Sequence, residues 1–220
     1  ISVADSHFDV VERPIPIPDS TGWVEKAGGT HPLRTCVSVS DNKNGLAQLP
    51  KGIYEYEVFD DAEHTLALTL IRACRIKLAV SEEKLTELPD TGVQCPGMQR
   101  YEYAIAVHPG NWSDAGLLNA AADFAAPVRI AMTGRGQGNL PNELSFLTLD
   151  NTDLQITAVK QAEDGQGLIV RLFNATDKPQ SAVLQWGQKL ASVVLSKADE
   201  SPIEKVKTDK VFARIQVPAK

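Results

Sequence analysis

The stretch that decides the fold is residues 35–59, TCVSVSDNKNGLAQLPKGIYEYEVF. Thr35–Ser40 alternates along the chain, and Ile53–Phe59 alternates again with acidic residues on one face. A period of two is typical of a β-strand that buries one face. The intervening cluster ends in Asn44-Gly45, a strong local turn signal. The stretch therefore predicts short strands joined by tight turns.

Further short strands are expected on both sides of this stretch. Leu66–Arg72 is almost continuously apolar, as a strand buried on both faces would be, and Tyr101–Val107 precedes a turn. One helix is expected at Ser113–Phe124, with Ser113 and Asp114 able to cap its start. The remaining strands are expected at 144–149, 154–161, 167–174, 182–186, 192–195 and 210–217. Many strands, one short helix and no βαβ rhythm predict an all-β protein built as a two-sheet sandwich.

The N-terminal part of the chain does not share the strand pattern. Pro14, Pro16 and Pro18 alternate with other residues, and proline cannot donate a ladder hydrogen bond inside a sheet. We therefore expect residues 1–34 to form an extended proline-rich strap and residues 35–220 to form the β-sandwich domain. A subdivision near 125–145 is an alternative, but one compact unit is favoured.

Composition limits the partners of the chain. A net charge of −6 and a pI near 5.3 argue against nucleic acid as a partner. The most basic stretch, Lys205–Lys210, is interrupted by Asp209 and is predicted to be a solvated turn. No apolar run approaches 18 residues, which argues against a membrane span. Three cysteines without CxxC spacing argue against a zinc knuckle and slightly favour the cytoplasm, although the compartment stays open.

Histidines and glycines give no strong catalytic motif. His7-Phe8-Asp9 has a spacing that suits a metal on a strand, but an ordinary surface pair is favoured. His31 and His108 each precede a proline and are interpreted as turn residues. The Gly134–Gly138 run lacks the Lys-Ser/Thr ending of a phosphate loop and is interpreted as a hairpin tip.

Paired carboxylates were considered because glycosidases need two of them. The sequence pairs are Glu55/Glu57, Asp60/Asp61, Glu82/Glu83 and Asp199/Glu200. A solvated strand face is the favoured interpretation of the first pair. Asn111-Trp112-Ser113 and Asn174-Ala175-Thr176 match the glycosylation sequon.

The order of several segments is more informative than any single motif. They run His31–Arg34, Val37–Asp41, Gly45–Ala47, Lys51–Tyr56, Leu66–Arg72, Cys95–Gln99, Tyr103–Trp112, Val159–Asp164 and Leu168–Asn174. Over about residues 30–185 this series resembles the C-terminal β region of glycoside hydrolase family 38, the α-mannosidases and mannosylglycerate hydrolases, especially bacterial members. The resemblance implies a galactose mutarotase-like supersandwich.

The resemblance implies that catalysis occurs elsewhere. Family 38 enzymes carry a zinc-binding His-x-Asp and a nucleophilic aspartate in an N-terminal α/β domain, and they retain anomeric configuration. His7-Phe8-Asp9 lacks the flanking Asn-Asp-Pro-Gly-Trp context of that motif. We therefore assign no catalytic or metal residue to this chain and expect zinc only in the catalytic domain of a parent protein.

One loop is a candidate for the edge of the sugar cleft. In this family the β region packs against the catalytic domain, and some of its loops approach the cleft. Pro96–Arg100 is the candidate, with Gln99 as hydrogen-bond donor and acceptor and Arg100 able to bind hydroxyls or a carboxylate. A plain inter-strand loop is the alternative.

The sequence therefore predicts a non-catalytic C-terminal domain of a retaining α-mannosidase-type glycosidase. Its expected partners are its own N-terminal catalytic domain and, in the parent, an α-mannoside, with homo-oligomerisation left open. An apolar docking patch is expected, with Trp23, the strap and Trp112 as contributors. An autonomous carbohydrate-binding module is the alternative, although aromatic residues make up only 6% of the chain. A mutarotase-like enzyme would need His31 or His108 to face a carboxylate.

Overall fold

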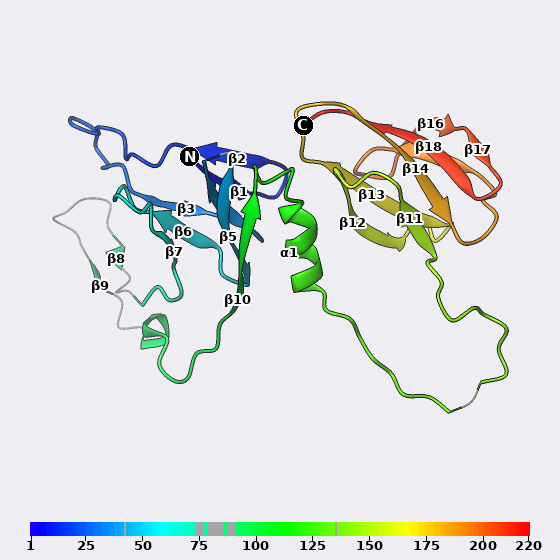
Figure 1. Ribbon diagram of the computed structural model, residues 1–220, viewed down its shortest axis with the longest axis horizontal. Helices are drawn as coiled ribbons and strands as arrows, with labels where there is room; N and C mark the ends of the chain where they lie inside the picture. The colour runs from blue at the N-terminus through cyan, green and yellow to red at the C-terminus, as the bar shows by residue number, and fades with distance from the viewer. Residues whose placement is uncertain (42, 74–76, 79–85, 88–90, 135) are drawn as a thin grey trace. The chain divides into compact units, whose positions relative to one another are not determined.

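The computed structural model describes residues 1–41, 43–73, 77–78, 86–87, 91–134 and 136–220 (Figure 1). Cys74 and the pair Glu82/Glu83 lie outside these residues. Within them the chain is built of β-strands, with the 3₁₀ turn η2 (Thr91–Gln94) and a single α-helix, α1 (Leu117–Ala125). This confirms the all-β fold class with one short helix.

The chain divides into two compact units, unit 1 (Ile1–Ala115) and unit 2 (Gly116–Lys220). The sequence-based division falls at residue 34, where the proline-rich segment ends. The division in the structure instead follows β10, because the first 34 residues supply strands to the sheets of unit 1.

Unit 1 contains a five-stranded and a three-stranded antiparallel sheet. The first has the order β10 (Glu102–Pro109), β5 (Asn44–Lys51), β4 (Val37–Ser40), β1 (Ser2–Asp5) and β2 (Val10–Arg13). The second has the order β3 (Thr30–Pro32), β6 (Glu55–Val58) and β7 (Leu66–Leu68). A short pair, β8 (Lys77–Leu78) and β9 (Thr86–Glu87), completes the described strands of the unit.

The core of unit 1 draws on both sheets, as expected for a two-layer sandwich. Ala4 and Val37 of the larger sheet pack with Tyr56 and Val58 of the smaller one. Tyr56 is fully buried, and its hydroxyl lies 3.2 Å from Ser2 Oγ, so a polar contact joins the sheets inside the core. Burial of these side chains is the main source of stability for the unit.

The N-terminal segment differs from the expected irregular strap. β1 lies inside the larger sheet between β4 and β2, and all four of its residues are buried. A four-residue strand buried on both faces shows no periodicity, so the pattern could not reveal it. The proline alternation correctly predicted that no inner strand follows Arg13. β2 ends at Arg13 and lies at the edge of the sheet.

Three local expectations were wrong. His31 and His108 lie in β3 and β10 and are not turn residues. Ser113 and Asp114 do not cap the helix, because the N-cap position is Gly116 and no described side chain bonds to it; their amides instead donate to Asn111 Oδ1 at 2.8 and 3.0 Å. The helix begins after Gly116, whose φ of 62° places it in the left-handed region.

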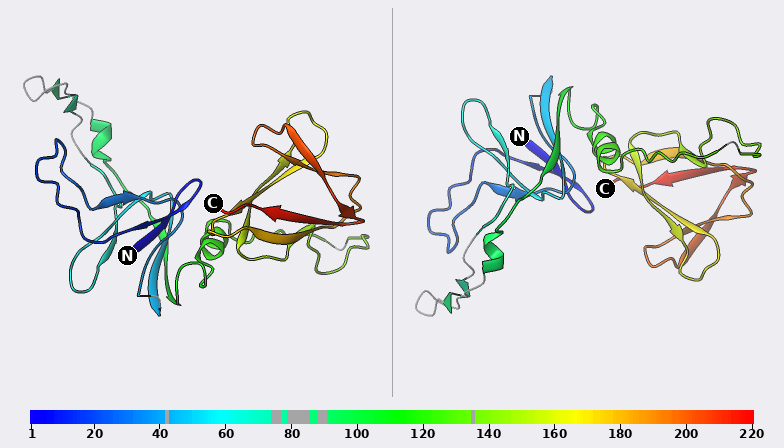
Figure 2. Two further views of the ribbon diagram at one scale, coloured as in Figure 1. Left: turned by 90° about the horizontal axis from the view of Figure 1, so that it is seen from above. Right: turned by 90° about the horizontal axis from the view of Figure 1, so that it is seen from below.

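Unit 2 is made of three sheets and α1 (Figure 2). Their strands are β11 (Leu147–Leu149), β14 (Gln180–Trp186), β18 (Phe212–Val217) and β17 (Thr208–Asp209), then β12 (Leu154–Gln161) with β13 (Leu168–Asn174), and β15 (Val193–Ser196) with β16 (Pro202–Val206). Buried Leu154, Leu184 and Ala213 anchor two of these sheets. The predicted solvated turn at Lys205–Lys210 was wrong, since β16 and β17 occupy most of it, although its side chains are largely exposed.

Between α1 and β11, the described residues 127–134 and 136–146 form neither helix nor strand. Val128, Ile130 and Met132 are each at least 90% exposed there. The glycine run lies in this segment, and β11 starts three residues later than the expected strand.

Candidate functional site

The loop before β10 contains the two residues predicted to reach a sugar cleft. Cys95 and Gly97 adopt positive φ values of 48° and 100°, which turn the chain sharply. Gln99 Nε2 donates to the Cys95 carbonyl at 3.3 Å and so closes the loop. Arg100 Nη2 lies 3.0 Å from Glu102 Oε1, but its side chain is 85% exposed, so this ion pair contributes little stability. Both side chains are therefore accessible to a ligand or a neighbouring domain.

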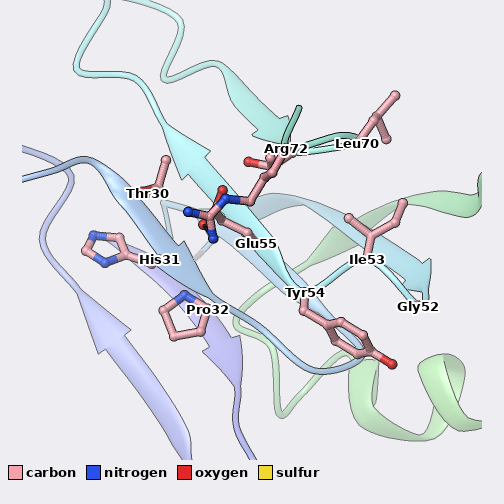
Figure 3. Close-up of a pocket in the computed structure, with 10 residues that line it drawn as sticks. Thr30, His31, Pro32, Gly52, Ile53, Tyr54, Glu55, Leu70 and Arg72 are labelled. Atoms are coloured by element: carbon pink, nitrogen blue, oxygen red, sulfur yellow. Dashed lines mark ion pairs between the residues drawn. The ribbon is translucent and has the colours of Figure 1, made fainter. Parts of the chain in front are cut away.

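A shallow pocket of about 390 Å³ lies on the smaller sheet of unit 1 (Figure 3). Its lining is Thr30, His31, Pro32, Gly52, Ile53, Tyr54, Glu55, Thr69, Leu70 and Arg72. Arg72 Nη1 lies 3.4 Å from Glu55 Oε2 in an ion pair, while the Tyr54 side chain points away from this pair. The exposed Arg72 makes the pair weak, so the pocket is an open depression of mixed polar and apolar lining.

His31 lies at the border of this pocket with its ring tilted against the buried Tyr56 ring at 5.9 Å. Partial burial lowers the pKa of His31, the positive charge of Arg13 lowers it further, and Glu57 opposes the change. His31 therefore favours the neutral imidazole. Its ring contact makes it a packing residue of the sheet.

His108 is buried against Ser38. His108 Nε2 lies 2.8 Å from Ser38 Oγ, and Nδ1 lies 3.2 Å from the Pro109 carbonyl oxygen. Because a carbonyl only accepts, Nδ1 carries the proton and Nε2 accepts from the serine hydroxyl. The two residues are 6% and 2% exposed, so the pair ties β4 to β10 without access to substrate.

The His7-Phe8-Asp9 triple, for which an ordinary surface pair was favoured, lies in the turn between β1 and β2. His7 is exposed and stacks loosely on Phe8, while Asp9 Oδ1 accepts from its neighbour Val10 N at 2.7 Å. In the part of the chain that the structure describes, no three His, Cys, Asp or Glu residues gather closely enough to hold a metal ion. Nor does any described helix have the length and apolarity needed to cross a membrane.

The carboxylate pairs from the sequence serve local structure. Asp61 accepts from Thr65 N and Oγ1, and these bonds hold the pKa of Asp61 below its usual range. Asp199 Oδ1 accepts from both the backbone N and the Oγ of Ser201. Glu200 Oε1 pairs with Lys160 Nζ at 2.8 Å. Asp61 and Asp199 therefore stabilise turns, and Glu200 joins the turn between β15 and β16 to β12.

The asparagine of the second sequon, Asn174, is buried and hydrogen-bonded within unit 2. Asn174 is 4% exposed; its Nδ2 donates to the Lys178 and Pro218 carbonyls, both at 2.8 Å, and its Oδ1 accepts from Thr176. Because its side-chain amide is buried and hydrogen-bonded, Asn174 cannot carry a glycan in the folded chain. Sequence inspection missed this role because a sequon and a buried turn asparagine look alike.

Asp5 is a buried polar residue that the sequence did not single out. It is 5% exposed, and its carboxylate accepts from Thr35 N at 2.7 Å, from Cys36 N at 2.8 Å and from Arg34 N at 3.2 Å. Burial and the nearby Asp5 charge raise the pKa of the Cys36 thiol well above its usual range. The thiol is therefore protonated and unreactive, which fits a packing role.

Comparison with known proteins connects these features to one family. Residues 153–220 match the family described as glycosyl hydrolases family 38 C-terminal beta sandwich domain. A putative mannosylglycerate hydrolase of Halalkalibacterium halodurans is 29% identical over 213 residues, which cover 97% of this chain and 22% of the relative. Residues 153–220 thus resemble the C-terminal β-sandwich domain of family 38, and nearly the whole chain is similar to a relative named as a mannosylglycerate hydrolase.

Solved family 38 structures show the same fold. An α-mannosidase from Enterococcus faecalis V583 superposes with a TM-score of 0.77 at 25% identity over 98% of this chain and 24% of that protein. A second family 38 protein from Enterococcus faecalis gives 0.74 at 25% identity with the same coverages. The chain thus spans less than a quarter of the length of these relatives.

Proposed function

We propose that this chain acts as the non-catalytic C-terminal domain of a retaining α-mannosidase-type glycoside hydrolase, where it packs on the catalytic domain. The proposal rests on the share of each relative's length that this chain covers. Nearly the whole chain matches relatives that are named mannosylglycerate hydrolase and α-mannosidase, yet it accounts for only 22–24% of their length. The matching region includes a domain described as the C-terminal β-sandwich of the family.

The chemistry of the reaction also favours a site elsewhere in the parent. A retaining glycosidase needs a nucleophile and an acid/base carboxylate about 5 Å apart. Glu55, the carboxylate beside the pocket, is paired with Arg72 and lies on an open surface. Zinc, when bound in the parent catalytic domain, would hold sugar hydroxyls. The described residues of this chain offer no ligand cluster for it, so no step of the reaction is assigned to them.

Within this function, Gln99 and Arg100 are the residues proposed to edge the sugar cleft. Exposure and position support this role, because both residues lie between the sharp turn at Cys95 and Gly97 and the start of β10. A guanidinium beside a sugar offers several donors to neighbouring hydroxyls. An α-mannoside bound in the parent is the proposed ligand.

Kinetics of the complete enzyme test this role. Arg100→Ala should lower kcat/KM for an α-mannoside by about 10-fold, since a hydrogen bond from a charged group contributes about 1.5 kcal/mol or more. Arg214→Ala, an exposed arginine on β18, is the matched control and should leave kcat/KM unchanged. Equal kinetics for both variants would remove Arg100 from the cleft while leaving the accessory-domain role intact.

The broader role is tested by assaying this chain alone with a chromogenic α-mannoside and added zinc, beside the complete enzyme. We expect hydrolysis only by the complete enzyme. Zinc-dependent turnover by the chain alone would contradict the proposal, and His7, Asp9, His31 and His108 would then need re-examination as a site.

A further inference from the structure

The two edges of the five-stranded sheet in unit 1 have different chemistry. At one edge, β2 has four residues, carries Glu12 and Arg13, and is followed by Pro14. Charges, short length and proline are the usual means by which proteins prevent further strands from pairing at an edge. This edge is therefore built to stay open to solvent.

The other edge, β10, is longer and carries a charged residue and a proline only at its two ends, Glu102 and Pro109. β10 has eight residues, and no charged residue or proline interrupts Tyr103–His108. Its only strand partner among the described residues is β5, so its outer side presents unpaired backbone groups. A long edge strand with an uncharged central part readily accepts another strand.

The exposed face of β10 is apolar. Tyr103, Ile105 and Val107 are 47%, 62% and 82% exposed, and the cross-strand partner of Val107, Leu46, is 40% exposed. Directly paired residues point to the same side of a sheet, so these four side chains form one surface, here called the β10 surface. Exposed apolar surface of this kind is typical of a contact site.

The core of unit 1 continues into this surface. Val37 and Val39 of β4 lie on the same face, because they pair with Gln48 and Leu46 of β5. They pack against the smaller sheet, with Val37 fully buried. The smaller sheet thus covers the β4 end of the face and leaves its β10 end uncovered.

We propose that the edge of β10 pairs with a β-strand from the remainder of the longer glycosidase polypeptide, which also covers the β10 surface. The inference rests on the proposed function. The occupant follows from length, since relatives that contain this fold carry more than three times as much additional polypeptide. Pairing would also fix the start of β10, and hence Gln99 and Arg100, at the boundary with that polypeptide.

Amide hydrogen exchange on the complete enzyme and on this 220-residue chain provides the test. Every second amide of an edge strand points away from its neighbour. In the chain alone these amides of β10 should exchange rapidly, and in the complete enzyme they should exchange at least about tenfold more slowly. Equal rates in the two proteins would overturn the proposal. Concentration-dependent protection in the chain alone would also overturn it, because a second copy would then occupy the edge.

Paired variants test the apolar contribution. Ile105→Lys should weaken binding of the chain to the separately produced remainder by about tenfold or more, as truncation of a buried interface residue does. Ile203→Lys on β16, where the isoleucine is 55% exposed, is the matched control and should bind as the unchanged chain does. Equal binding by both variants would overturn the assignment of the surface. The α-mannosidase activity of the complete, unchanged enzyme is measured separately, so failure of the proposed function remains distinguishable.

Discussion

At the scale of single residues, two asparagines with the same sequon have opposite hydrogen-bond requirements. Asn174 uses its Nδ2 as a donor to two carbonyls, whereas the described bonds of Asn111 only accept through Oδ1. A carboxylate preserves acceptors and removes donors. An Asn→Asp substitution therefore removes a needed donor at Asn174 but keeps the needed acceptor at Asn111, so the second position serves as the control for the first.

Asn174→Asp should lower the free energy of unfolding by about 2–4 kcal/mol, because it places a buried carboxylate against two carbonyl oxygens. Asn111→Asp should change it little. Urea unfolding followed by circular dichroism measures both. Equal losses in the two variants would show that donation by Asn174 does not matter.

The buried Cys36 thiol predicts how stability depends on pH. Burial raises the pKa of Cys36 in the folded state, whereas in the unfolded chain a thiol titrates near about 8.5. Above that pH the unfolded state loses a proton that the folded state keeps. Stability should therefore fall as pH rises, with Cys36 contributing up to about 1.4 kcal/mol per pH unit.

Urea unfolding between about pH 8 and pH 10.5 checks this prediction, with Cys36→Ala as the control. Other groups titrate in both proteins, so the difference in slope isolates the thiol. The variant should lose stability less steeply than the unchanged chain. Parallel slopes would mean that the thiol ionises equally in both states.

At the scale of elements, Gly45 allows β4, β5 and β10 to meet. A methyl group at Gly45 would lie 2.2 Å from His108 Cε1 and 2.9 Å from Ser40 Cβ. Gly28, in contrast, has no atom within 4 Å of such a group. The glycine therefore leaves room for the imidazole ring that bonds Ser38.

Gly45→Ala should destabilise the chain by about 1–3 kcal/mol through overpacking. Gly28→Ala should be neutral. Adding His108→Ala to Gly45→Ala should recover part of the steric loss, which a double-mutant cycle in urea can measure. A cycle without coupling would exclude His108 as the group in conflict.

The elements also show what sequence patterns can and cannot predict. The strand expected at 154–161 is β12, and the helix was placed within a few residues, because each is long enough to display its period. β1 escaped notice because four buried residues display none. The Asn44-Gly45 signal did mark the turn region, but Gly45 itself lies in β5, where the absence of a side chain leaves room for His108.

Site residues were harder to predict than strands. Gln99 and Arg100 were named from the family resemblance, and the structure adds that their loop is exposed and leads into an edge strand. The β10 surface was not named, although Tyr103, Ile105 and Val107 alternate with alanine in the sequence. Alternation shows that two faces differ, but which one is covered depends on the other layer. The expected docking residue Trp23 is 56% exposed, and its role stays a prediction.

At the scale of the whole molecule, we predict that activity requires both this chain and the polypeptide that its relatives carry beyond it. The direct measurement is α-mannoside hydrolysis, with zinc present, by the separately produced remainder before and after this chain is added. We predict no turnover by the chain alone and a clear increase in the rate of the remainder when the chain binds. Turnover by the chain alone, or a remainder whose rate is the same with and without it, would contradict the account.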